Sequence, residues 1–445
     1  MYENKKILVL GAAKSGMAVT KLLLGKNNDI TVSDMKPLKE ADERFLKENN
    51  IKIVITNKQE DLVNAPWDLI IKNPAIMSTS KVMQAINEKN IRVENEMEVA
   101  YHFLPEDVKI IGVTGSNGKT TTTKIIYELL KASGFNPVLG GNIGYPLAEI
   151  LPNIKKGGIL LLEISDHQLC DLHDFKTHIS VLTNICPTHL DYHGTYEAYK
   201  KTKSKIFQNQ TASDYAIINM ENVDALEESQ NAVSQKLFFS SKGSINANAY
   251  LKDDEIYVNG QKVININDIR LKGIHNYENI LAAYLVLSLF TSDFSKTHKF
   301  LENFCGVEHR IEYVKTINSV KYYNDSKSTN PTSTITALKT FSENINLILG
   351  GLNRNQDFHE LDDYMQNVVA IYAIGETTDK VMEYAKSIGK KAYRCETLHN
   401  AMDKIVSNAL PSEVVLLSPG SSSQDQYARF EDRGDEFKKY LENFS

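Results

Sequence analysis

Residues 113–121 read Val113-Thr-Gly-Ser-Asn-Gly-Lys-Thr-Thr121 and lie between an apolar run and an amphipathic stretch. The apolar run, residues 108–113, predicts a strand, and residues 122–130 carry apolar side chains at helical spacing. A strand, a glycine-containing loop and a helix in this order attract phosphate, because backbone N–H groups and the helix dipole favour an anion. Lys119 adds a full positive charge, and Thr120 is placed to ligate a nucleotide-bound magnesium ion.

This loop is shorter than the usual P-loop, which has four residues between its two glycines. Here the pattern is Gly115-x-x-Gly118-Lys119-Thr120. We expect it to hold nucleotide phosphates with the residues Gly115, Ser116, Asn117, Gly118, Lys119, Thr120 and Thr121. The departure in spacing narrows the set of nucleotide-binding proteins that the loop can represent.

Size and composition restrict the class of protein. The chain has 445 residues, and single cores rarely grow beyond about 250–300 residues, so two or three domains are expected. The formal net charge of −6 argues against a nucleic acid or an anionic membrane as partner. No apolar run approaches the roughly 18 residues that a membrane-spanning helix needs. The N-terminal sequence also lacks a signal-peptide pattern.

The four cysteines, Cys170, Cys186, Cys305 and Cys395, are far apart and show no C-x-x-C spacing. They are typical of reduced thiols and not of disulfides or a zinc site. We therefore expect a cytoplasmic protein.

Strand and helix patterns alternate along the whole chain and predict an α/β fold of three domains. We expect a Rossmann-like domain over residues 1–103, a P-loop ATPase-like domain over residues 104–306, and a second Rossmann-like domain over residues 307–445. Within the central domain, residues 237–239, 249–251 and 255–258 resemble short strands of a meander.

The first predicted strand, residues 7–10, leads into Gly11-Ala-Ala-Lys-Ser-Gly16, and the second ends at Asp34. Such a loop could bind a nucleotide, and Asp34 could reach a ribose or a base. The loop is not G-x-G-x-x-G, however, and the motif alone favours a simple tight turn over a nucleotide site.

Three polar side chains after the phosphate loop are candidates for metal chemistry. Glu163 ends a buried strand, where a carboxylate is costly unless a cation or hydrogen bonds meet it. It is either a magnesium ligand across from Thr120 or a partnered core residue. His189 follows the next strand, but magnesium prefers oxygen ligands, so an ordinary loop histidine is the alternative. Lys203 lies among other lysines, a pattern that by itself indicates an exposed helix face.

Two later segments concentrate polar groups. Asn276 and Asn279 lie three residues apart at the start of a predicted helix, where they could contact an adenine edge or simply cap the helix. Asp325, Lys327 and Thr329 follow a strand and could meet ribose, phosphate and substrate, or form an ordinary polar loop.

Together these segments resemble the Mur ligases over essentially the whole chain, and most closely the D-glutamate-adding members of that family. One such motif would be weak evidence, but six in the family's order are strong evidence. The matching pieces are Thr114-Gly-Ser-Asn-Gly-Lys-Thr-Thr121, Gly140-Gly-Asn-Ile-Gly144, Gly273-x-His-Asn-x-x-Asn279, His309-Arg310, Asn324-Asp-Ser-Lys-x-Thr-Asn330 and Leu417-Ser-Pro419.

The resemblance implies an ATP-dependent ligase that joins D-glutamate to UDP-N-acetylmuramoyl-L-alanine through an acyl phosphate, as a monomer, in peptidoglycan precursor synthesis. Such chemistry needs charge neutralisation at the transferred phosphoryl group and close positioning of three substrates. The resemblance implies two magnesium ions, one held by Thr120 and Glu163 and the other at His189. It also makes Lys203 a carbamylated lysine, whose added oxygens would suit magnesium.

The resemblance also assigns the substrate contacts. The UDP-linked substrate would meet Lys14, Ser15, Asp34, Lys36, Asn142, Ser165 and Gln168. Beyond the phosphate loop, ATP would meet Asn276, Asn279, Arg310, Asp325 and Lys327. The incoming glutamate would meet Thr329, Arg354, Ser423 and Phe430. The resemblance thus places Lys119, His189, Lys203, Asp325 and Lys327 in the catalytic machinery.

Several positions depart from the family pattern. The usual Glu-x-Ser-Ser-Phe-Gln is Glu163-Ile-Ser-Asp-His-Gln168 here, which puts the Asp166 carboxylate where pyrophosphate should approach. That charge is repulsive unless a metal or His167 compensates it. Asn353 and Ser421 also replace usual residues in later loops. These changes affect substrate detail more than reaction type.

Two alternatives stay open. One is a ligase of the same superfamily with another specificity, such as an L-glutamate-adding or folylpolyglutamate-type enzyme. The other is a non-catalytic nucleotide-binding module that kept the fold, although a decayed site is expected to lose buried charges first.

Overall fold

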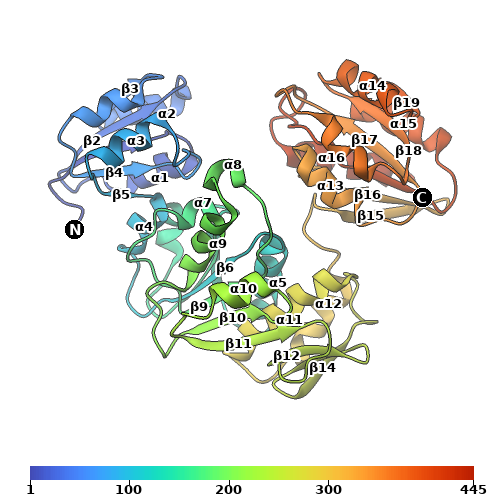
Figure 1. Ribbon diagram of the computed structural model, residues 1–445, viewed down its shortest axis with the longest axis horizontal. Coiled ribbons are helices and arrows are strands. Elements are labelled where there is room, and N and C mark those ends of the chain that lie inside the picture. The colour runs from blue at the N-terminus through green and yellow to red at the C-terminus, as the bar shows by residue number, and fades with distance from the viewer. Residues whose placement is uncertain (445) are drawn as a thin grey trace. The chain divides into compact units, whose positions relative to one another are not determined.

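The computed structural model describes residues 1–444, which form three β-sheets flanked by helices (Figure 1). The chain divides into two compact units, residues 1–304 and residues 305–445. The first unit contains two sheets, and the second contains one. The three-domain α/β class expected from the sequence therefore corresponds to three sheets built mainly from parallel strands.

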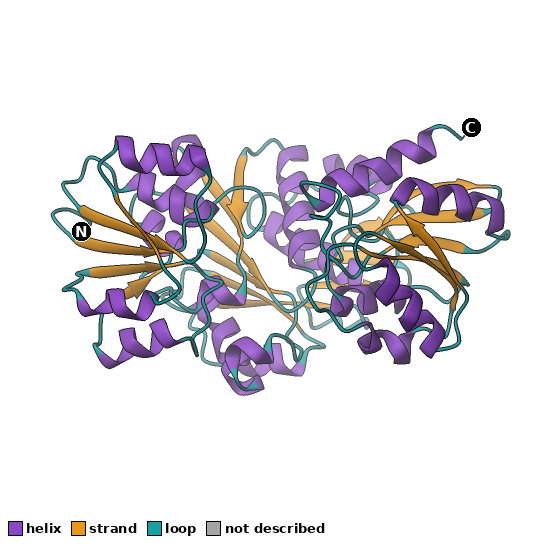
Figure 2. Cartoon of the chain, turned by 90° about the horizontal axis from the view of Figure 1, so that it is seen from above, coloured by secondary structure: helices purple, strands orange, loops and turns teal. Residues whose placement is uncertain are grey.

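The first sheet is fully parallel and has the strand order β3-β2-β1-β4-β5. Its strands are β1 (Lys6–Leu10), β2 (Asp29–Asp34), β3 (Lys52–Ile55), β4 (Leu69–Lys72) and β5 (Val93–Glu94). The helices around it are α1 (Lys14–Leu22), α2 (Glu40–Glu48), the 3₁₀ helix η1 (Gln59–Asn64), α3 (Lys81–Glu88) and α4 (Glu96–Tyr101). Helices cover both faces of this sheet (Figure 2), which fits the apolar runs of its strands β1 and β4.

The second sheet has nine strands in the order β14-β13-β12-β11-β10-β9-β6-β8-β7. They are β6 (Lys109–Thr114), β7 (Pro137–Gly141), β8 (Ile159–Glu163), β9 (Ile179–Leu182), β10 (Tyr215–Asn219), β11 (Gln235–Ser240), β12 (Ala249–Lys252), β13 (Glu255–Val258) and β14 (Gln261–Asn265). Because β6 lies between β8 and β9, the loops after all three strands meet at one edge of the sheet.

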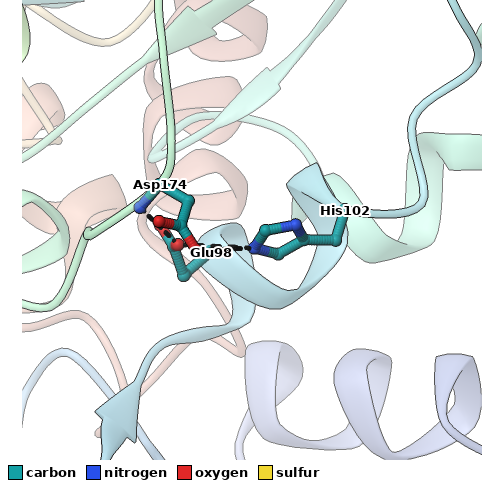
Figure 3. Close-up of side chains that lie close together, drawn as sticks. All are labelled: Glu98, His102 and Asp174. Atoms are coloured by element: carbon teal, nitrogen blue, oxygen red, sulfur yellow. Dashed lines mark hydrogen bonds and ion pairs between the residues drawn. The ribbon is translucent and has the colours of Figure 1, made fainter. Parts of the chain in front are cut away.

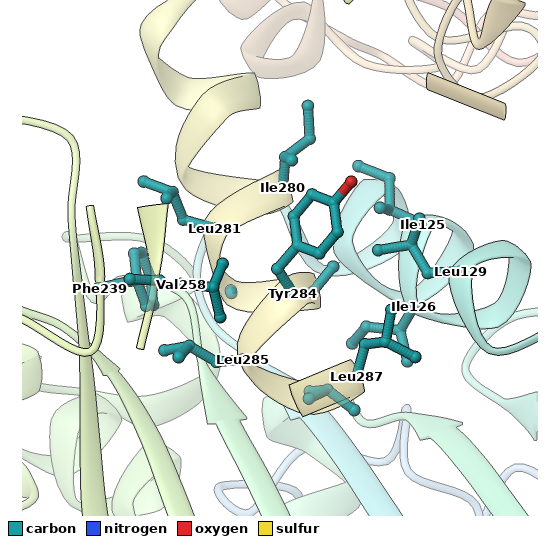
Figure 4. Packing of buried hydrophobic residues seen from close by; sticks show 14 of the residues in the cluster. Ile125, Ile126, Leu129, Phe239, Val258, Ile280, Leu281, Tyr284, Leu285 and Leu287 are labelled. Carbon is teal, nitrogen blue, oxygen red and sulfur yellow. The ribbon is translucent and has the colours of Figure 1, made fainter. Parts of the chain in front are cut away.

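The helices of this part are α5 (Lys119–Ala132), α6 (Leu147–Ile150), α7 (Asp166–Leu169), α8 (Leu190–His193), α9 (Tyr196–Ser204), α10 (Val223–Glu228), α11 (Ile274–Ser288) and α12 (His298–Asn303), with 3₁₀ turns η2 (Leu151–Asn153), η3 (Lys205–Phe207) and η4 (Ser295–Thr297). Helix α11 packs against α5 on one face of the sheet. There Ile280 and Tyr284 lie near Ile125 and Leu129 (Figure 4). This apolar contact supports the helix that follows the phosphate loop.

The meander expected at residues 237–258 is only partly correct. Strands β12, β13 and β14 pair antiparallel, as a meander does. Strand β11, however, pairs parallel with β12 and with β10, so it belongs to the parallel part of the sheet. The short apolar run 237–239 carries no signal that distinguishes these two pairings.

The third sheet has the order β15-β16-β20-β17-β18-β19 and is parallel except for the β15–β16 pair. Its strands are β15 (Glu312–Ile317), β16 (Val320–Asn324), β17 (Ile345–Gly350), β18 (Val368–Ile374), β19 (Ala392–Glu396) and β20 (Val414–Leu417). Its helices are α13 (Pro331–Leu338), η5 (Phe358–Tyr364), α14 (Thr378–Ser387), α15 (Leu398–Asn408) and α16 (Phe430–Glu442).

Three buried glutamates lie between residues 94 and 98, and two of them, Glu96 and Glu98, connect the first sheet to the second. Glu94 accepts a hydrogen bond from Tyr2, and Glu96 accepts the backbone N–H of Ala148 at the start of α6. Glu98 accepts three backbone N–H groups from residues 173–175. Each glutamate is at most 4% exposed. The predicted boundary at residues 103/104 follows this segment directly.

None of the helices in the described part of the chain combines the length and the apolar character that a membrane-spanning helix needs.

The buried Glu96 makes the stability of the first unit depend on pH. Burial raises the pKa of its carboxyl to about 7, despite the hydrogen bond from Ala148. Between the ordinary glutamate pKa and about 7, the folded state binds more protons, so stability should fall as the pH rises through this window. The Glu96→Gln variant should not show this loss. At pH 8 its free energy of unfolding should therefore exceed that of the wild type by something on the order of 3 kcal/mol.

Urea unfolding followed by fluorescence can measure this, because the chain's one tryptophan, Trp67, lies in the same unit. Glu106→Gln, at an exposed site, is the matched control. Equal pH profiles for wild type and Glu96→Gln would show that Glu96 is not the titrating group.

Candidate active site

The phosphate loop connects β6 to α5, as the sequence predicts. Gly118 has φ +82°, and a Cβ at this position would lie 2.4 Å from the Asn279 side-chain oxygen. Only glycine therefore suits this close approach. The Lys119 ammonium folds back onto the loop and donates to the carbonyls of Gly115 (2.9 Å) and Ser116 (3.0 Å). A cation and the start of a fourteen-residue helix thus converge on one loop.

Glu163 ends β8, next to the strand that leads into the phosphate loop. It is 1% exposed, and its Oε1 accepts a hydrogen bond from Asn142 Nδ2 at 2.8 Å. Its Oε2 is buried and has no hydrogen-bond partner in the described part of the chain. A buried carboxylate with one orphaned oxygen is costly, which fits a cation as its missing partner. Hard divalent cations such as magnesium favour this type of oxygen.

Asp166, the first residue of α7, is 2% exposed and lies among three nitrogen-bearing side chains. Its Oδ2 is 2.8 Å from His193 Nε2 and 3.3 Å from His167 Nδ1, and its Oδ1 is 3.4 Å from Lys203 Nζ. Burial alone would raise the pKa of this carboxyl. The His193 hydrogen bond and the Lys203 charge outweigh burial and lower the pKa overall.

Lys203 is completely buried, so the exposed-face interpretation of its lysine cluster is wrong. The α9 helix turns this residue inward, where Nζ donates to Thr114 Oγ1 at 3.3 Å. Burial and the charge of Lys119 lower the pKa of Lys203 to about 7, against the raising effect of Asp166. The neighbouring lysines gave no signal of this, because helix phase alone does not show which face is covered.

His189 precedes α8 with φ +53°, an unusual backbone conformation for a residue other than glycine. It is exposed, and its ring centroid lies 5.3 Å from that of His167. The loop after β9 therefore brings His189 near the Asp166 cluster.

A buried lysine joins the first sheet to this histidine-bearing loop. Lys72, at the end of β4, lies 2.9 Å from the Asp171 carboxylate and 3.3 Å from the Tyr192 hydroxyl. Tyr192 also donates to the carbonyls of Pro74 and Ile76. The sequence gave no warning of Lys72, since a polar residue at a strand end usually faces solvent.

Four of the residues predicted to meet the UDP-linked substrate lie around the first loop, and several of these four already contact protein groups. Asn142, Ser165 and Gln168 lie instead after β7 and at the start of α7. Asp34 accepts the backbone N–H groups of Ala12 and Lys36. The Lys14 ammonium donates to the Gly144 carbonyl at 2.7 Å and lies 4.2 Å from the centroid of the Tyr145 ring. Ser15 is half-buried. These contacts fix the loop geometry and connect it to the loop after β7.

The capping interpretation of Asn276 and Asn279 is wrong, because the residue that caps α11 is Gly273. Asn279 is 6% exposed and accepts a hydrogen bond from Thr122 on α5, so it supports the phosphate loop. A capping box does occur at α7, where Ser165 and Gln168 exchange hydrogen bonds.

In the second unit, Asp325 follows β16 and is 2% exposed. Burial raises the pKa of its carboxyl to about 6, although hydrogen bonds from Ser328 and Ser418 act in the opposite direction. Its Oδ1 also accepts the Ile311 backbone N–H, one residue after Arg310. Lys327 is half-buried beside it.

The residues predicted for the amino acid follow neighbouring strands. Thr329 lies after β16, Arg354 after β17, and Ser423 and Phe430 after β20. Since these strands are parallel neighbours, their following loops lie at one edge of the sheet. Arg354 is exposed and donates to the side chain of Gln424 at 2.7 Å.

Arg433 was missed by sequence reasoning, because it reads as an ordinary charged residue on α16. It is 1% exposed and donates to Ser326 Oγ, to the Ser326 carbonyl and to the Ser421 carbonyl. It therefore connects the loops after β16 and β20, which carry Lys327 and Ser423.

A second carboxylate–histidine group, Glu98, His102 and Asp174, lies apart from these residues (Figure 3). His102 Nε2 is 3.5 Å from oxygens of both acids. Glu98 is already saturated by backbone N–H groups, and Arg92 lies 3.3 Å from Asp174. This group therefore has the properties of a structural clamp.

Comparison with protein families identifies two domains in order. Residues 113–287 match the Mur ligase middle domain, and residues 309–420 match the domain described as Mur ligase, glutamate ligase domain. The chain belongs to the Mur ligase family. The ligase is 41% identical over 439 residues to UDP-N-acetylmuramoylalanine--D-glutamate ligase of Geobacillus kaustophilus, covering 98% of this chain and 97% of the relative.

It is also 39% identical over 440 residues to the Bacillus cereus (strain G9842) protein of the same name, with the same coverage. Solved structures show the same fold. UDP-N-acetylmuramate-alanine ligase of Thermotoga maritima aligns with a TM-score of 0.57 at 18% identity, covering 99% of each chain. The MurF ligase of Thermotoga maritima, determined in complex with ADP, aligns at 0.55 and 19% identity, covering 99% of the ligase and 96% of MurF.

Proposed function

We propose that this ligase joins D-glutamate to the lactoyl-alanine carboxylate of UDP-N-acetylmuramoyl-L-alanine, using ATP. Full-length relatives with this name support the choice of substrates. The observation that carries the reaction type is the orphaned Glu163 oxygen beside the phosphate loop. We place the reaction in the cytoplasm, as a step of peptidoglycan precursor synthesis, where widely spaced thiols stay reduced.

In the proposed reaction, the substrate carboxylate attacks the γ-phosphorus of ATP and ADP leaves. The amine of D-glutamate then attacks the acyl carbon, phosphate leaves, and the nitrogen loses a proton. Bound magnesium would supply positive charge to the transferred phosphoryl group. Thr120 and Glu163 would hold one ion, and a second would lie near His189. Lys119 would exchange its two loop carbonyls for phosphate oxygens.

The other residues that we assign to ATP and to glutamate lie near the edge of each sheet where the parallel strands end. Asn279 and Thr122 hold Gly118 in place, so that the loop N–H groups stay directed toward phosphate. In the second unit, Asp325 and Lys327 would contact ATP. Arg354 would bind the glutamate side-chain carboxylate, because its planar fork can donate to both oxygens.

Glu163→Gln tests the metal site. The variant keeps the acceptor for Asn142 but loses the charge, so Mn²⁺ affinity in the presence of ATP should fall at least about tenfold. The melting temperature of the metal-free protein should not fall, because no protein cation pairs with Glu163 Oε2. Titration followed by electron paramagnetic resonance measures bound Mn²⁺, with the exposed Glu149→Gln as matched control. Unchanged Mn²⁺ affinity would remove Glu163 from the site.

Phosphate release with UDP-N-acetylmuramoyl-L-alanine and ATP tests the substrates. We expect release with D-glutamate, little with L-glutamate, and almost none from Lys119→Ala, which lacks the phosphate-loop charge. Release with L-glutamate alone would indicate the alternative specificity. Release with neither amino acid would contradict the proposed ligation.

A further inference from the structure

Lys72 is a buried cation at the point where three segments of the first unit meet. Its side chain is 1% exposed, and a buried ammonium is costly unless its charge and its donors find partners. It finds one partner in each segment. Nζ lies 2.9 Å from Asp171 Oδ2 after α7, and it donates to the Ile76 carbonyl at 3.0 Å and to the Tyr192 hydroxyl at 3.3 Å.

Tyr192 connects this lysine to the one-turn helix α8. It is 3% exposed, and its hydroxyl donates to the carbonyls of Pro74 and Ile76. Its own backbone N–H donates to the His189 carbonyl at 3.1 Å. Ser78 adds a hydrogen bond from its hydroxyl to the Tyr192 carbonyl at 3.3 Å. The side chain of Tyr192 thus binds the segment after β4, while its backbone closes the helical turn that starts at His189.

The segment after β4, residues 73–76, packs against the first loop, which follows β1. A Cβ on Gly11 of that loop would lie only 2.8 Å from the Asn73 Cβ. The first loop carries residues that we assign to the UDP-linked substrate. A continuous set of contacts therefore leads from the substrate loop through Lys72 to α8.

Helix α8 depends on such contacts for its position. It has four residues, too few to be stable without support from the rest of the protein. His189, which precedes it, has φ +53°, a conformation that costs energy in a residue other than glycine and persists where the surroundings hold it. His189 itself is exposed, so its place depends on the buried residues that follow it, among them Tyr192.

We propose that Lys72 is a positioning residue of the ligase reaction. It holds α8, and with it His189, against the segment that adjoins the UDP-linked substrate, and it contacts no reacting atom itself. The proposal rests on the proposed function, in which His189 lies near the transferred phosphoryl group. Since a displacement of about 1 Å can lower turnover about a hundredfold, such a residue affects kcat more than substrate affinity.

Lys72→Met removes the charge and keeps most of the length of the side chain. We expect kcat to fall at least about tenfold, because α8 is released, while the KM for ATP stays unchanged. In the substrate-free full-length protein, hydrogen exchange followed by mass spectrometry should become faster at residues 192–194, whose N–H groups bond to the His189 and Leu190 carbonyls. An unchanged kcat would overturn the proposal, and so would unchanged exchange.

A second variant separates positioning from stability. Lys72→Met leaves the Asp171 carboxylate buried without its cation, which should lower the melting temperature. Lys72→Met/Asp171→Asn removes that unpaired charge, so the melting temperature should rise again, whereas kcat and the exchange of α8 should stay as in the single variant. Recovery of kcat together with the melting temperature would overturn the proposal, because Lys72 would then act through stability alone.

Tyr192→Phe tests the route of the effect. It removes the hydroxyl that Lys72 and two carbonyls after β4 share, so kcat should fall as in Lys72→Met. In the double variant Lys72→Met/Tyr192→Phe the two losses should not multiply, because both break one set of contacts. Losses that multiply would show that Lys72 does not act through Tyr192 and would contradict the proposal.

Lys176→Met is the matched control, because Lys176 is another partly buried lysine, 2.8 Å from the buried carboxylate of Asp214. It should leave kcat and the exchange of α8 unchanged, and a loss equal to that of Lys72→Met would count against the proposal. The exchange measurement needs no substrate. Failure of D-glutamate as substrate would therefore contradict the proposed function and leave the exchange result standing.

Discussion

The buried negative charge beneath the phosphate loop constrains the rest of this structure. Glu163 and Asp166 are both enclosed at the carboxyl edge of the second sheet, three residues apart, and buried carboxylates need cations or hydrogen-bond donors. Lys203 and two histidines meet Asp166, but one oxygen of Glu163 has no partner among the described residues. A bound cation can supply the partner that this buried Glu163 oxygen lacks. The protein's folding energy comes from elsewhere, notably from the apolar packing of α11 on α5.

The need of buried charged groups for partners also explains why the two sheets of the first unit are firmly joined. Lys72 reaches from the first sheet to Asp171 and Tyr192, beside the histidine-bearing loop, while Glu96 and Glu98 bind backbone N–H groups of the second part. Buried polar contacts of this kind tolerate little displacement, because each broken partner leaves a charge or donor unsatisfied. The loops that would hold the UDP-linked substrate are therefore fixed relative to the phosphate loop.

Sequence patterns predicted the α/β class, the strand–loop–helix of the phosphate cradle and most parallel strands, because apolar runs and glycine positions are local signals. They failed for Lys203, whose burial depends on how α9 packs, and for the capping role of Asn279, which instead touches Gly118 from a distant helix. They also gave no sign of Arg433, whose three bonds join loops remote in sequence. Non-local contacts decided each of these cases.

We propose that the phosphate loop holds ATP while its γ-phosphoryl group passes to the substrate carboxylate. Isotope transfer measures this directly. If UDP-N-acetylmuramoyl-L-alanine carries ¹⁸O in its free carboxylate, the acyl-phosphate route leaves one labelled oxygen in the phosphate released during ligation. If both carboxylate oxygens are labelled, mass spectrometry should therefore show one ¹⁸O in the released phosphate for each amide bond formed. Amide product formed with unlabelled phosphate would contradict the account, because the carboxylate oxygen would then never have bonded to phosphorus.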